Sequence, residues 1–301
     1  GKVLDIACND GTQLDKFKDK GWKTFGVDPA ENLLKLSAPN HTVKCEYWTE
    51  DVAESFGEKF NIITAQNVFA HVHDVHEFLR ACALSLESDG LVFIQTSQSD
   101  MIIDSQFDTV YHEHLSFFSS MSMKTCANIN GFSLIDVKKT PIHGGSYVFI
   151  LRHGEHDETL AEARIEAENA SGVYDMDTYK QYTLKCKKVV SDFSQKVKEL
   201  KNDGFKVVGY GAAAKGNTFL NFADIELDYI VDDNELKQGL LTPGMDIPIV
   251  SSEKLREEDP SKTAVVPLAW NFFEEIRARA NEESDENFTF IKYFPSLEVI
   301  L

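Results

Sequence analysis

The first hundred residues alternate between short apolar runs and segments with helical periodicity, and this alternation constrains the fold more than any other feature. The run KVLDIAC, at residues 2–8, has the length and continuity of a strand buried on both faces. It leads through the turn residues NDG into a helical pattern, and further apolar runs follow at 24–27, 60–66 and 91–96. Before the last run, HDVHEFLRACALSLESDG is expected to form a helix that is capped by Asp74. Alternation of this kind predicts a parallel, doubly wound α/β sheet.

Composition limits the class of protein. A chain of 301 residues with 43% hydrophobic content is long enough for two domains with separate cores. The formal net charge of −19 argues against nucleic acid and anionic membranes as partners, because both would repel such a surface. No apolar run approaches the roughly 18 residues of a membrane span, and five scattered cysteines without a CxxC pair indicate neither a zinc site nor a disulfide framework. We therefore expect a cytoplasmic protein that is a monomer or a weak oligomer.

Polar residues follow several predicted strands, at the edge where open parallel sheets bind ligands. Asn9 and Gly11 follow the first strand, Asp28 ends the second and Asn67 follows the strand at 60–66. An acid at the end of the second strand can accept hydrogen bonds from a ribose diol, and the first turn lacks the GxGxxG pattern of a pyrophosphate-binding loop. The combination suits a nucleoside without phosphate, such as S-adenosylmethionine, although an ordinary turn and helix cap would look similar. The residues predicted to contact this cofactor are Asp5, Asn9, Gly11, Asp28, Asn32, Asn67 and Phe69.

The segment FDTVYHEHLSFFS, at residues 107–119, concentrates side chains that exchange protons. An imidazole accepts protons near neutrality, because its unperturbed pKa is about 6.5. The same segment is equally compatible with a polar loop whose histidines face water, and Phe117 and Phe118 are expected to anchor it to the core. The candidates for proton transfer in this segment are Asp108, Tyr111, His112, Glu113 and His114.

The second half of the chain begins with charged helices and then repeats the strand–turn–helix pattern. Residues 155–203 are expected to form two helices that are broken near Ser171 and Gly172. KVVGYGAAAKGNTFL then places Gly211 at a strand end and Lys215 at the start of a helix, an arrangement that suits a phosphate although it is not a P-loop. Asp232 ends the next strand, where it is placed for a ribose or base. Trp270 and Asn271 follow a later apolar strand, where Trp270 is either a ligand contact or a packing residue.

Several segments together resemble the S-adenosylmethionine-dependent C-methyltransferases that act on nucleotide-linked deoxysugars. The order and spacing of that family are matched by GKVLDIACNDGTQL, TFGVDPAENL, QNVFAHVHDVHEFL, FDTVYHEHLSFFS and PIHGGS. Its C-terminal domain is resembled by VVGYGAAAKGNTFLNF, YIVDDNELKQGLLTPGMDIPIV and LAWNFFEEI. The resemblance covers nearly the whole chain, with two departures. The family usually begins with a small zinc-binding module that is absent here, and SQSD follows the strand at 91–96 where an acidic, tyrosine-bearing sequence is usual.

The resemblance implies a fold and a reaction. We predict a class I methyltransferase domain at 1–152, a helical connector at 153–204 and a Rossmann-like sugar-nucleotide-binding domain at 205–301. Carbon methylation beside the ketone of a deoxysugar nucleotide needs a base for the α-proton and donors for the enolate oxygen. His114 is the predicted base, and either Glu113 or Asp108 would orient it. Tyr111 and His71 would donate to the oxygen, so the predicted catalytic residues are His114, Tyr111, Glu113 and His71.

The resemblance also implies where the substrate binds. Lys215 and Asn217 are expected near the phosphates, and the turn at His143 is expected near the sugar. The predicted substrate-binding residues are His143, Gly211, Lys215, Asn217, Asp232, Trp270 and Asn271.

Other functions are compatible with the same residues. The same scaffold could support O-methylation of a sugar hydroxyl, with His114 deprotonating an alcohol. A nicotinamide oxidoreductase would instead use Gly211 and Asp232, and a third possibility is a non-catalytic sugar-nucleotide-binding remnant. His71, His73 and His76 in HVHDVH, or His112 with His114, could be taken for metal ligands. A metal site needs three or four converging groups, and a helix N-terminus with solvent-facing histidines explains the pattern, so we predict no bound metal.

Overall fold

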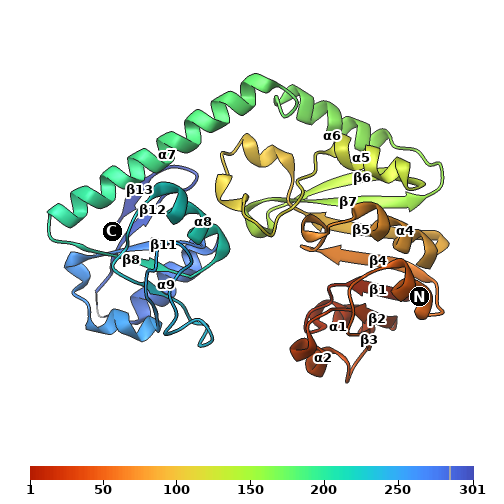
Figure 1. Ribbon diagram of the computed structural model, residues 1–301, viewed down its shortest axis with the longest axis horizontal. Helices are drawn as coiled ribbons and strands as arrows, with labels where there is room; N and C mark the ends of the chain where they lie inside the picture. The colour runs from red at the N-terminus through yellow and green to blue at the C-terminus, as the bar shows by residue number, and fades with distance from the viewer. Residues whose placement is uncertain (285) are drawn as a thin grey trace. The chain divides into compact units, whose positions relative to one another are not determined.

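The computed structural model describes residues 1–284 and 286–301, apart from the side chain of His143. The chain divides into two compact units (Figure 1). Gly1–Asp100 and Glu113–Tyr174 form the N-terminal unit, and Met101–His112 with Asp175–Leu301 forms the C-terminal unit. Each unit is built on its own β-sheet with helices packed against it, which confirms the prediction of two α/β folds.

The N-terminal unit contains a seven-stranded sheet. Its strands are β1 (Lys2–Ile6), β2 (Lys23–Val27), β3 (Thr42–Lys44), β4 (Phe60–Gln66), β5 (Leu86–Thr96), β6 (Phe132–Thr140) and β7 (Ser146–His153). They lie in the order β3-β2-β1-β4-β5-β7-β6, and β7 is antiparallel to both of its neighbours while the other pairs are parallel. The order reverses between β1 and β4, so the sheet is doubly wound as predicted.

Short helices connect these strands. They are α1 (Thr12–Lys18), α2 (Glu31–Ser37), α3 (Glu50–Ser55), α4 (Val75–Ser85), α5 (Ser120–Ile129) and α6 (Thr159–Ala170), with the 3-10 turns η1 (Phe69–His71) and η4 (Ile142–Gly144). Asp74 caps α4 as predicted, because its Oδ1 accepts the N–H groups of His76 and Glu77 at 2.9 Å each. The helix ends earlier than its sequence pattern indicates. Leu86 pairs with Phe60 and begins β5, which takes the expected last turn of the helix into the sheet.

Two hydrophobic clusters pack against the sheet of this unit, a small one around Val3, Cys8 and Leu14 and a larger one on the opposite face. Leu4 and Ile6 of β1, Ile63 of β4 and Ile94 of β5 are all buried there, together with residues of α4 and α5. Glu168 of α6 is also buried, and its carboxylate accepts from the N–H and the hydroxyl of Ser120 at the start of α5. A carboxylate bonded to a helix N-terminus is well compensated for its burial. This contact fixes α6 to the sheet-covering helices.

The C-terminal unit contains a six-stranded sheet. Its strands are β8 (Lys206–Tyr210), β9 (Ile230–Val231), β10 (Ile249–Val250), β11 (Thr263–Pro267), β12 (Thr289–Lys292) and β13 (Glu298–Ile300). They lie in the order β10-β9-β8-β11-β12-β13, and only the β12–β13 pair is antiparallel among the strand pairs described. The helices are α7 (Met176–Asn202), α8 (Ala214–Ala223) and α9 (Phe273–Glu282), with the 3-10 turns η3 (Phe107–Thr109), η5 (Ser252–Glu257), η6 (Pro260–Lys262) and η7 (Trp270–Phe272).

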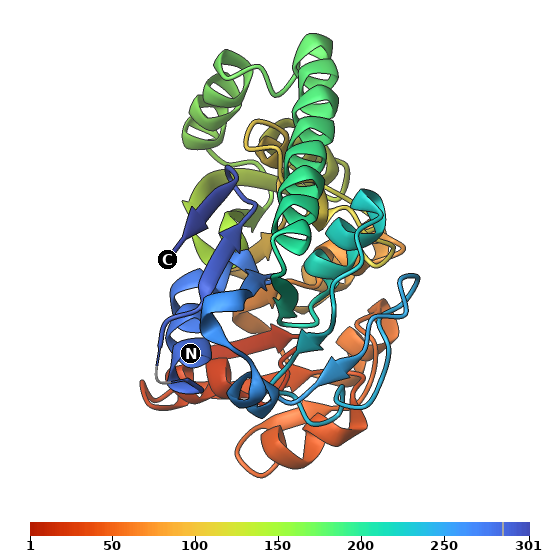
Figure 2. The same cartoon turned by 90° about the vertical axis from the view of Figure 1, so that its left-hand side faces the viewer.

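The helical region between the two sheets agrees with its sequence pattern. The predicted break in the charged helical region is confirmed, because α6 ends at Ala170 and α7 begins at Met176 and continues without interruption (Figure 2). Phe193 and Val197 of α7 are buried in the core of the C-terminal unit. No helix in the described part of the chain combines the length and the apolar character needed to cross a membrane.

The segment Met101–His112 packs with the C-terminal unit although the residues on both sides of it belong to the N-terminal unit. Phe107 of η3 contacts the rings of Phe219 and Phe222 on α8, with ring centroids 5.8 and 5.1 Å apart. Cys186 of α7 lies with its Sγ 3.8 Å from the carbonyl oxygen of Ser105. We call Met101–His112 the crossover segment.

Candidate active site

A cavity of about 460 Å³ opens at the carboxyl ends of β1 and β2 in the N-terminal unit. This is the edge at which doubly wound sheets bind ligands, and the volume is within the usual range for a small-molecule site. The cavity wall includes the aromatic side chains of Tyr47, Trp48 and Phe78, with Val72 between η1 and α4. Asp28 and His71 also line it, so it contains one residue predicted for the cofactor and one predicted for catalysis.

Asp28 organises the loops around this cavity. It is 9% exposed, its Oδ2 accepts the N–H of Asn9 at 2.9 Å, and its Oδ1 accepts the N–H of Ala30 at 2.9 Å. Each carboxylate oxygen retains a second lone pair. Asp28 can therefore hold both loops and still accept hydrogen bonds from a ligand diol.

The turn after β1 requires glycine at position 11. Gly11 has φ +87°, and a Cβ at this position would lie 2.9 Å from Cδ2 of His41. The His41 ring is itself held by Thr24, whose Oγ1 lies 2.8 Å from Nδ1. Gly11 is thus required by the backbone conformation and by the close approach of His41.

The other residues predicted to contact the cofactor are not among the described residues that line the cavity. Asn67 follows β4 with φ 52°, and its N–H donates to the carbonyl of Gln95. Asn32 is exposed on α2. Phe69 is fully buried, and its ring packs against Phe78 and Phe118 at 5.2 and 4.9 Å, so it supports the wall from the core.

Asp5 is buried inside the sheet. Its Oδ1 accepts from the hydroxyl of Thr64 on β4 at 2.6 Å. Burial raises the pKa of Asp5 from its ordinary 3.8 to about 7, the hydrogen bond from Thr64 opposes this rise, and the charge of Asp28 adds to it. Asp5 is therefore a carboxyl group that changes its charge near neutral pH.

The structure brings two of the predicted catalytic residues together. The rings of His71 and His114 lie edge to face, with centroids 4.8 Å apart. The N–H groups of Leu115 and Ser116 donate to the carbonyl of Ala70, at 2.8 and 3.2 Å, and tie this stretch to η1. Because His71 lines the cavity, the His114 imidazole lies beside the cavity wall. Phe118 is buried nearby, which confirms that it anchors the segment.

The remaining catalytic candidates are divided between the units. Glu113 belongs to the N-terminal unit and is exposed, whereas Tyr111 and His112 belong to the crossover segment, where their ring centroids are 6.3 Å apart. Asp108 was one of two carboxylates expected to orient His114, and the structure gives it a different partner. Its Oδ2 accepts from Nε1 of Trp270 at 2.6 Å, within the C-terminal unit.

In the C-terminal unit, Lys215 and Trp270, which are both predicted to bind the substrate, lie close together. Lys215 is in the first turn of α8, and its Nζ lies 5.1 Å from the centre of the Trp270 ring. Burial lowers the pKa of Lys215, and the charge of Asp108 opposes that fall. Asn217 lies further along α8, and Asn271 neighbours Trp270 in η7. Gly216 allows the close packing here, because a Cβ at this position would lie 2.5 Å from Cβ of Leu268.

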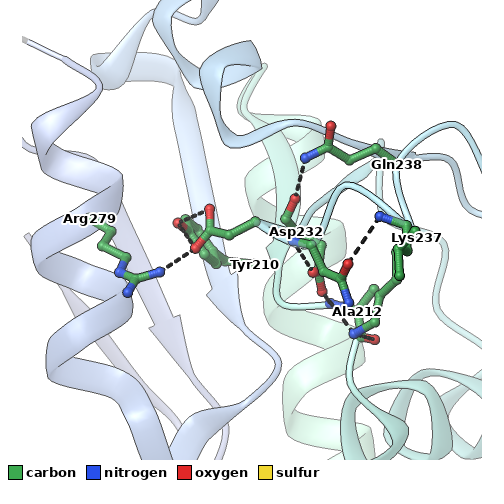
Figure 3. Close-up of polar contacts among 9 residues, drawn as sticks. Tyr210, Ala212, Asp232, Lys237, Gln238 and Arg279 are labelled. Atoms are coloured by element: carbon green, nitrogen blue, oxygen red, sulfur yellow. Dashed lines mark hydrogen bonds and ion pairs between the residues drawn. The ribbon is translucent and has the colours of Figure 1, made fainter. Parts of the chain in front are cut away.

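Asp232 follows β9 and braces the turn that contains Gly211. Its Oδ2 accepts the N–H of Ala212 at 2.7 Å, and Nζ of Lys237 lies 3.3 Å from the same oxygen (Figure 3). Gln238 donates to the main-chain carbonyl of Asp232 at 3.0 Å. The neighbouring Asp233 accepts from the Tyr210 hydroxyl and from Arg279.

Two structural features bear on the rest of the prediction. His143 lies in η4, the expected turn between β6 and β7, and its side chain is outside the described residues. Tyr47 and Trp48 were not identified from the sequence, because β3 before them has only three residues and gives little periodicity. The available signal was an aromatic pair that begins three residues after the end of β3. Among the described residues, no group of three or more His, Cys, Asp or Glu side chains is arranged to hold a metal ion.

Comparison with known proteins agrees with this geometry. The family described as "Methyltransferase domain" matches residues 1–137, and the family described as "C-methyltransferase C-terminal domain" matches residues 141–295. C-methyltransferase NovU of Streptomyces niveus is 31% identical over 310 aligned residues, which cover 99% of this chain and 73% of NovU. The ubiquinone biosynthesis O-methyltransferase of Bartonella quintana is 29% identical, over 45% of this chain and 61% of its own length. A solved S-adenosylmethionine-dependent methyltransferase from Archaeoglobus fulgidus covers 46% of this chain and 62% of its own, with 20% identity and a TM-score of 0.40.

The sheet order, the cavity at its carboxyl edge and the methyltransferase-domain match define a class I methyltransferase that uses S-adenosylmethionine. The C-terminal match covers more than half of the chain, and the similarity to NovU covers nearly all of it. The chain belongs to the C-methyltransferase family.

Proposed function

We propose that this methyltransferase transfers a methyl group to a carbon beside the ketone of a nucleotide-linked deoxysugar. The observation that carries the proposal is the His71–His114 pair at the wall of the cofactor cavity. It places an imidazole that can remove a proton beside the site that fits the methyl donor. The similarity to C-methyltransferase NovU supports carbon as the methyl acceptor.

The cavity fits S-adenosylmethionine. Asp28 at its wall is suited to the ribose hydroxyls, and Trp48, Phe78 and Val72 give an apolar surface suited to an adenine ring. When bound, S-adenosylmethionine supplies a methyl group on a sulfonium, which is an electrophile for a carbon nucleophile. The chain must then generate that nucleophile and align it.

In the proposed reaction His114 removes the proton from the carbon beside the ketone. The electron pair of the broken C–H bond forms a C=C bond, and negative charge develops on the ketone oxygen. His71 and Tyr111 donate hydrogen bonds to this oxygen. Glu113 orients His114 and stabilises its protonated form. The carbon of the resulting enolate then forms the new bond to the methyl group while the methyl–sulfur bond breaks, so that its electron pair stays on sulfur in S-adenosylhomocysteine and the ketone re-forms.

The C-terminal unit is proposed to hold the nucleotide. Lys215 lies at the start of a ten-residue helix, where N–H groups and a positive side chain together suit a phosphate. The chain has a net charge of −19, so most of its surface would repel an anionic ligand. The local positive charge of Lys215 supports binding of such a ligand at this helix. Lys215 and Asn217 would contact the diphosphate, and Gly211, Asp232, Trp270 and Asn271 would surround it, with His143 nearer the sugar.

All five cysteines are free, which supports a cytoplasmic setting.

Hydrogen exchange at the substrate carbon tests the mechanism. The protein is incubated in D₂O with S-adenosylhomocysteine and a 4-keto-6-deoxyhexose nucleotide, and deuterium at the adjacent carbon is followed by NMR. We expect exchange with the parent protein and a loss of about 100-fold in His114→Ala, within the usual contribution of a general base. His112→Ala serves as the control, because His112 is exposed and has no proposed role. Absence of exchange with the parent protein would contradict enolisation.

O-methylation is the second candidate, favoured by the similarity of part of the chain to O-methyltransferases. The two candidates differ in the product, since a new C–CH₃ group and an O–CH₃ group have well-separated carbon chemical shifts. A product with the methyl group on oxygen, formed without exchange at carbon, would establish this alternative.

A further inference from the structure

The crossover segment carries a buried carboxylate that the proposed reaction does not use. Asp108 is 2% exposed, and its Oδ2 accepts from the indole N–H of Trp270 at 2.6 Å. Its Oδ1 is buried and has no hydrogen-bond partner among the residues that the structure describes. A buried carboxylate is costly unless it is compensated. The interactions that Asp108 makes must therefore offset the cost of burying it.

The group held by Asp108 is the Trp270 indole. The indole N–H is bonded to Asp108, and the ring packs on Phe294 with centroids 4.4 Å apart. The hydrogen bond and this ring contact, which is tilted by 38°, together define the plane of the indole. The Lys215 ammonium lies 5.1 Å from the centre of the same ring, so the position of the indole bears on the position of the charge.

Asp108 and Lys215 also support each other electrostatically. Burial raises the pKa of Asp108 and the nearby Lys215 charge opposes this rise. Burial lowers the pKa of Lys215 and Asp108 opposes that fall. The nearby Asp108 carboxylate thus favours the ammonium form of Lys215, although this lysine is half-buried. Phe107, which contacts Phe219 and Phe222, fixes η3 against the helix that carries Lys215.

We propose that Asp108 is a positioning residue for the nucleotide-binding region of the C-terminal unit. Its carboxylate holds the Trp270 indole, and through the indole it holds the Lys215 ammonium in the place where it meets the diphosphate of the substrate. The inference rests on the proposed function, because it assumes that Lys215 contacts the diphosphate. Asp108 belongs to the part of the sequence that matches the methyltransferase domain, yet by this inference it contributes to recognition of the nucleotide.

The test is the binding of UDP and of thymidine diphosphate, measured by calorimetry with the full chain. Asp108→Ala removes the acceptor for the indole N–H, and we expect nucleotide affinity to fall about tenfold or more, as for loss of a hydrogen bond to a charged group. Asp108→Asn retains a side-chain oxygen that can accept from the indole, so its affinity should stay within about threefold of the parent value. In turnover, Asp108→Ala should raise KM for the nucleotide sugar and change kcat at saturation by less than about threefold.

A double-mutant cycle separates positioning from general damage. Trp270→Phe removes the indole N–H, so Asp108→Ala should have little further effect in that background. Asp104→Ala is the matched control, because Asp104 is an exposed acid in the same segment. S-adenosylhomocysteine affinity, which reports on the N-terminal unit, should be unchanged in every variant. Rescue by Asn distinguishes positioning from unfolding.

Three results would overturn the inference, each in a different way. If Lys215→Ala weakens nucleotide binding and Asp108→Ala does not, Asp108 has no positioning role and the proposed diphosphate site stands. If Lys215→Ala leaves nucleotide binding unchanged, the proposed diphosphate site fails and the role of Asp108 fails with it. Multiplicative effects of Asp108→Ala and Trp270→Phe would also contradict the inference.

Discussion

The two sheets of this methyltransferase each end their second strand with an aspartate, and the two aspartates make closely similar contacts. Asp28 accepts N–H groups from Asn9 and Ala30, and Asp232 accepts them from Ala212 and Asn234. In both units one oxygen holds the turn after the first strand and the other holds the turn that follows the acid itself. In both units the aspartate thus stabilises two adjacent turns through hydrogen bonds.

The difference lies in what else reaches the carboxylate. Asp28 lines a cavity of about 460 Å³, whereas Lys237 approaches Asp232 and donates to the carbonyl of Ala212 as well. The same acid at the same strand end therefore faces a ligand-sized space in one unit and the side chain of Lys237 in the other. An acid at the end of a second strand therefore indicates that the acid stabilises the adjoining turns. It indicates a ribose contact only where a cavity lies beside the acid.

A second contrast concerns the first strand of each sheet. The fourth residue is Asp5 in β1 and Gly209 in β8. Gly209 is packed against Ile230 and Leu268, so that position leaves no room for a side chain in the C-terminal unit. A buried group that titrates near neutrality thus occurs at this position in one unit and not in the other.

Replacing Asp28 should have the largest effect. Asp28→Ala removes the proposed acceptor for two ribose hydroxyls, each worth about 1.5 kcal/mol for a bond to a charged group, so affinity for S-adenosylhomocysteine should fall about 100-fold. Calorimetric titration measures this directly. Asp232→Ala should leave the same affinity unchanged. Equal losses in the two variants would remove the proposed distinction between the acids.

Asp5 should make the N-terminal unit sensitive to pH. Between about pH 4 and pH 7 the folded chain keeps a proton that the unfolded chain releases, so its free energy of unfolding falls as pH rises through this window. Asp5→Asn removes that dependence. Its gain in stability over the parent should therefore shrink by about 2 kcal/mol when the pH is lowered from 8 to 5.5, at about 1.4 kcal/mol per unit below pH 7.

Tryptophan fluorescence can report this unit selectively. In a Trp270→Phe background the remaining tryptophans are Trp22 and Trp48, and both lie in the N-terminal unit. Urea unfolding of the background and of its Asp5→Asn derivative at the two pH values gives the comparison. A stability difference that is the same at both pH values would show that Asp5 does not titrate in this range.

Removing the acid in the C-terminal unit should affect stability. Asp232→Ala leaves the N–H groups of Ala212 and Asn234 without their acceptor, which should lower the free energy of unfolding by about 1–2 kcal/mol. Asp232→Asn keeps one acceptor oxygen and should lose less. Urea denaturation followed by circular dichroism measures both variants. An unchanged midpoint in Asp232→Ala would show that the turn does not depend on this brace.

The lysine over Asp232 should matter least for stability. The Lys237 side chain is 40% exposed, so its ion pair is screened by water and Lys237→Met should cost less than about 1 kcal/mol. Lys254→Met, which breaks an exposed pair with Glu257, is the matched control. A loss well above the control in the same denaturation assay would indicate that Lys237 closes the turn as firmly as Asp232 does.

Much of this architecture was predictable because it is encoded locally. Continuous apolar runs such as the one at β4 and the cap at Asp74 depend on neighbouring residues, so the strands, several helices and the polar edge of the first sheet follow from the sequence. The contact of Asp108 with Trp270 joins residues 162 positions apart, and no periodicity signals it. The cavity wall at Tyr47 and Trp48 escaped prediction because the preceding strand is too short to show a pattern.

The crossover segment limits how this protein can be divided. The chain changes unit after Asp100, again after His112 and a third time after Tyr174. A fragment that ended at Tyr174 would retain Phe107 and Asp108 without the rings and the indole that cover them, exposing apolar surface and an uncompensated carboxylate. The units are therefore not exchangeable modules. A chimera with a relative should take residues 101–112 and the C-terminal unit from the same parent.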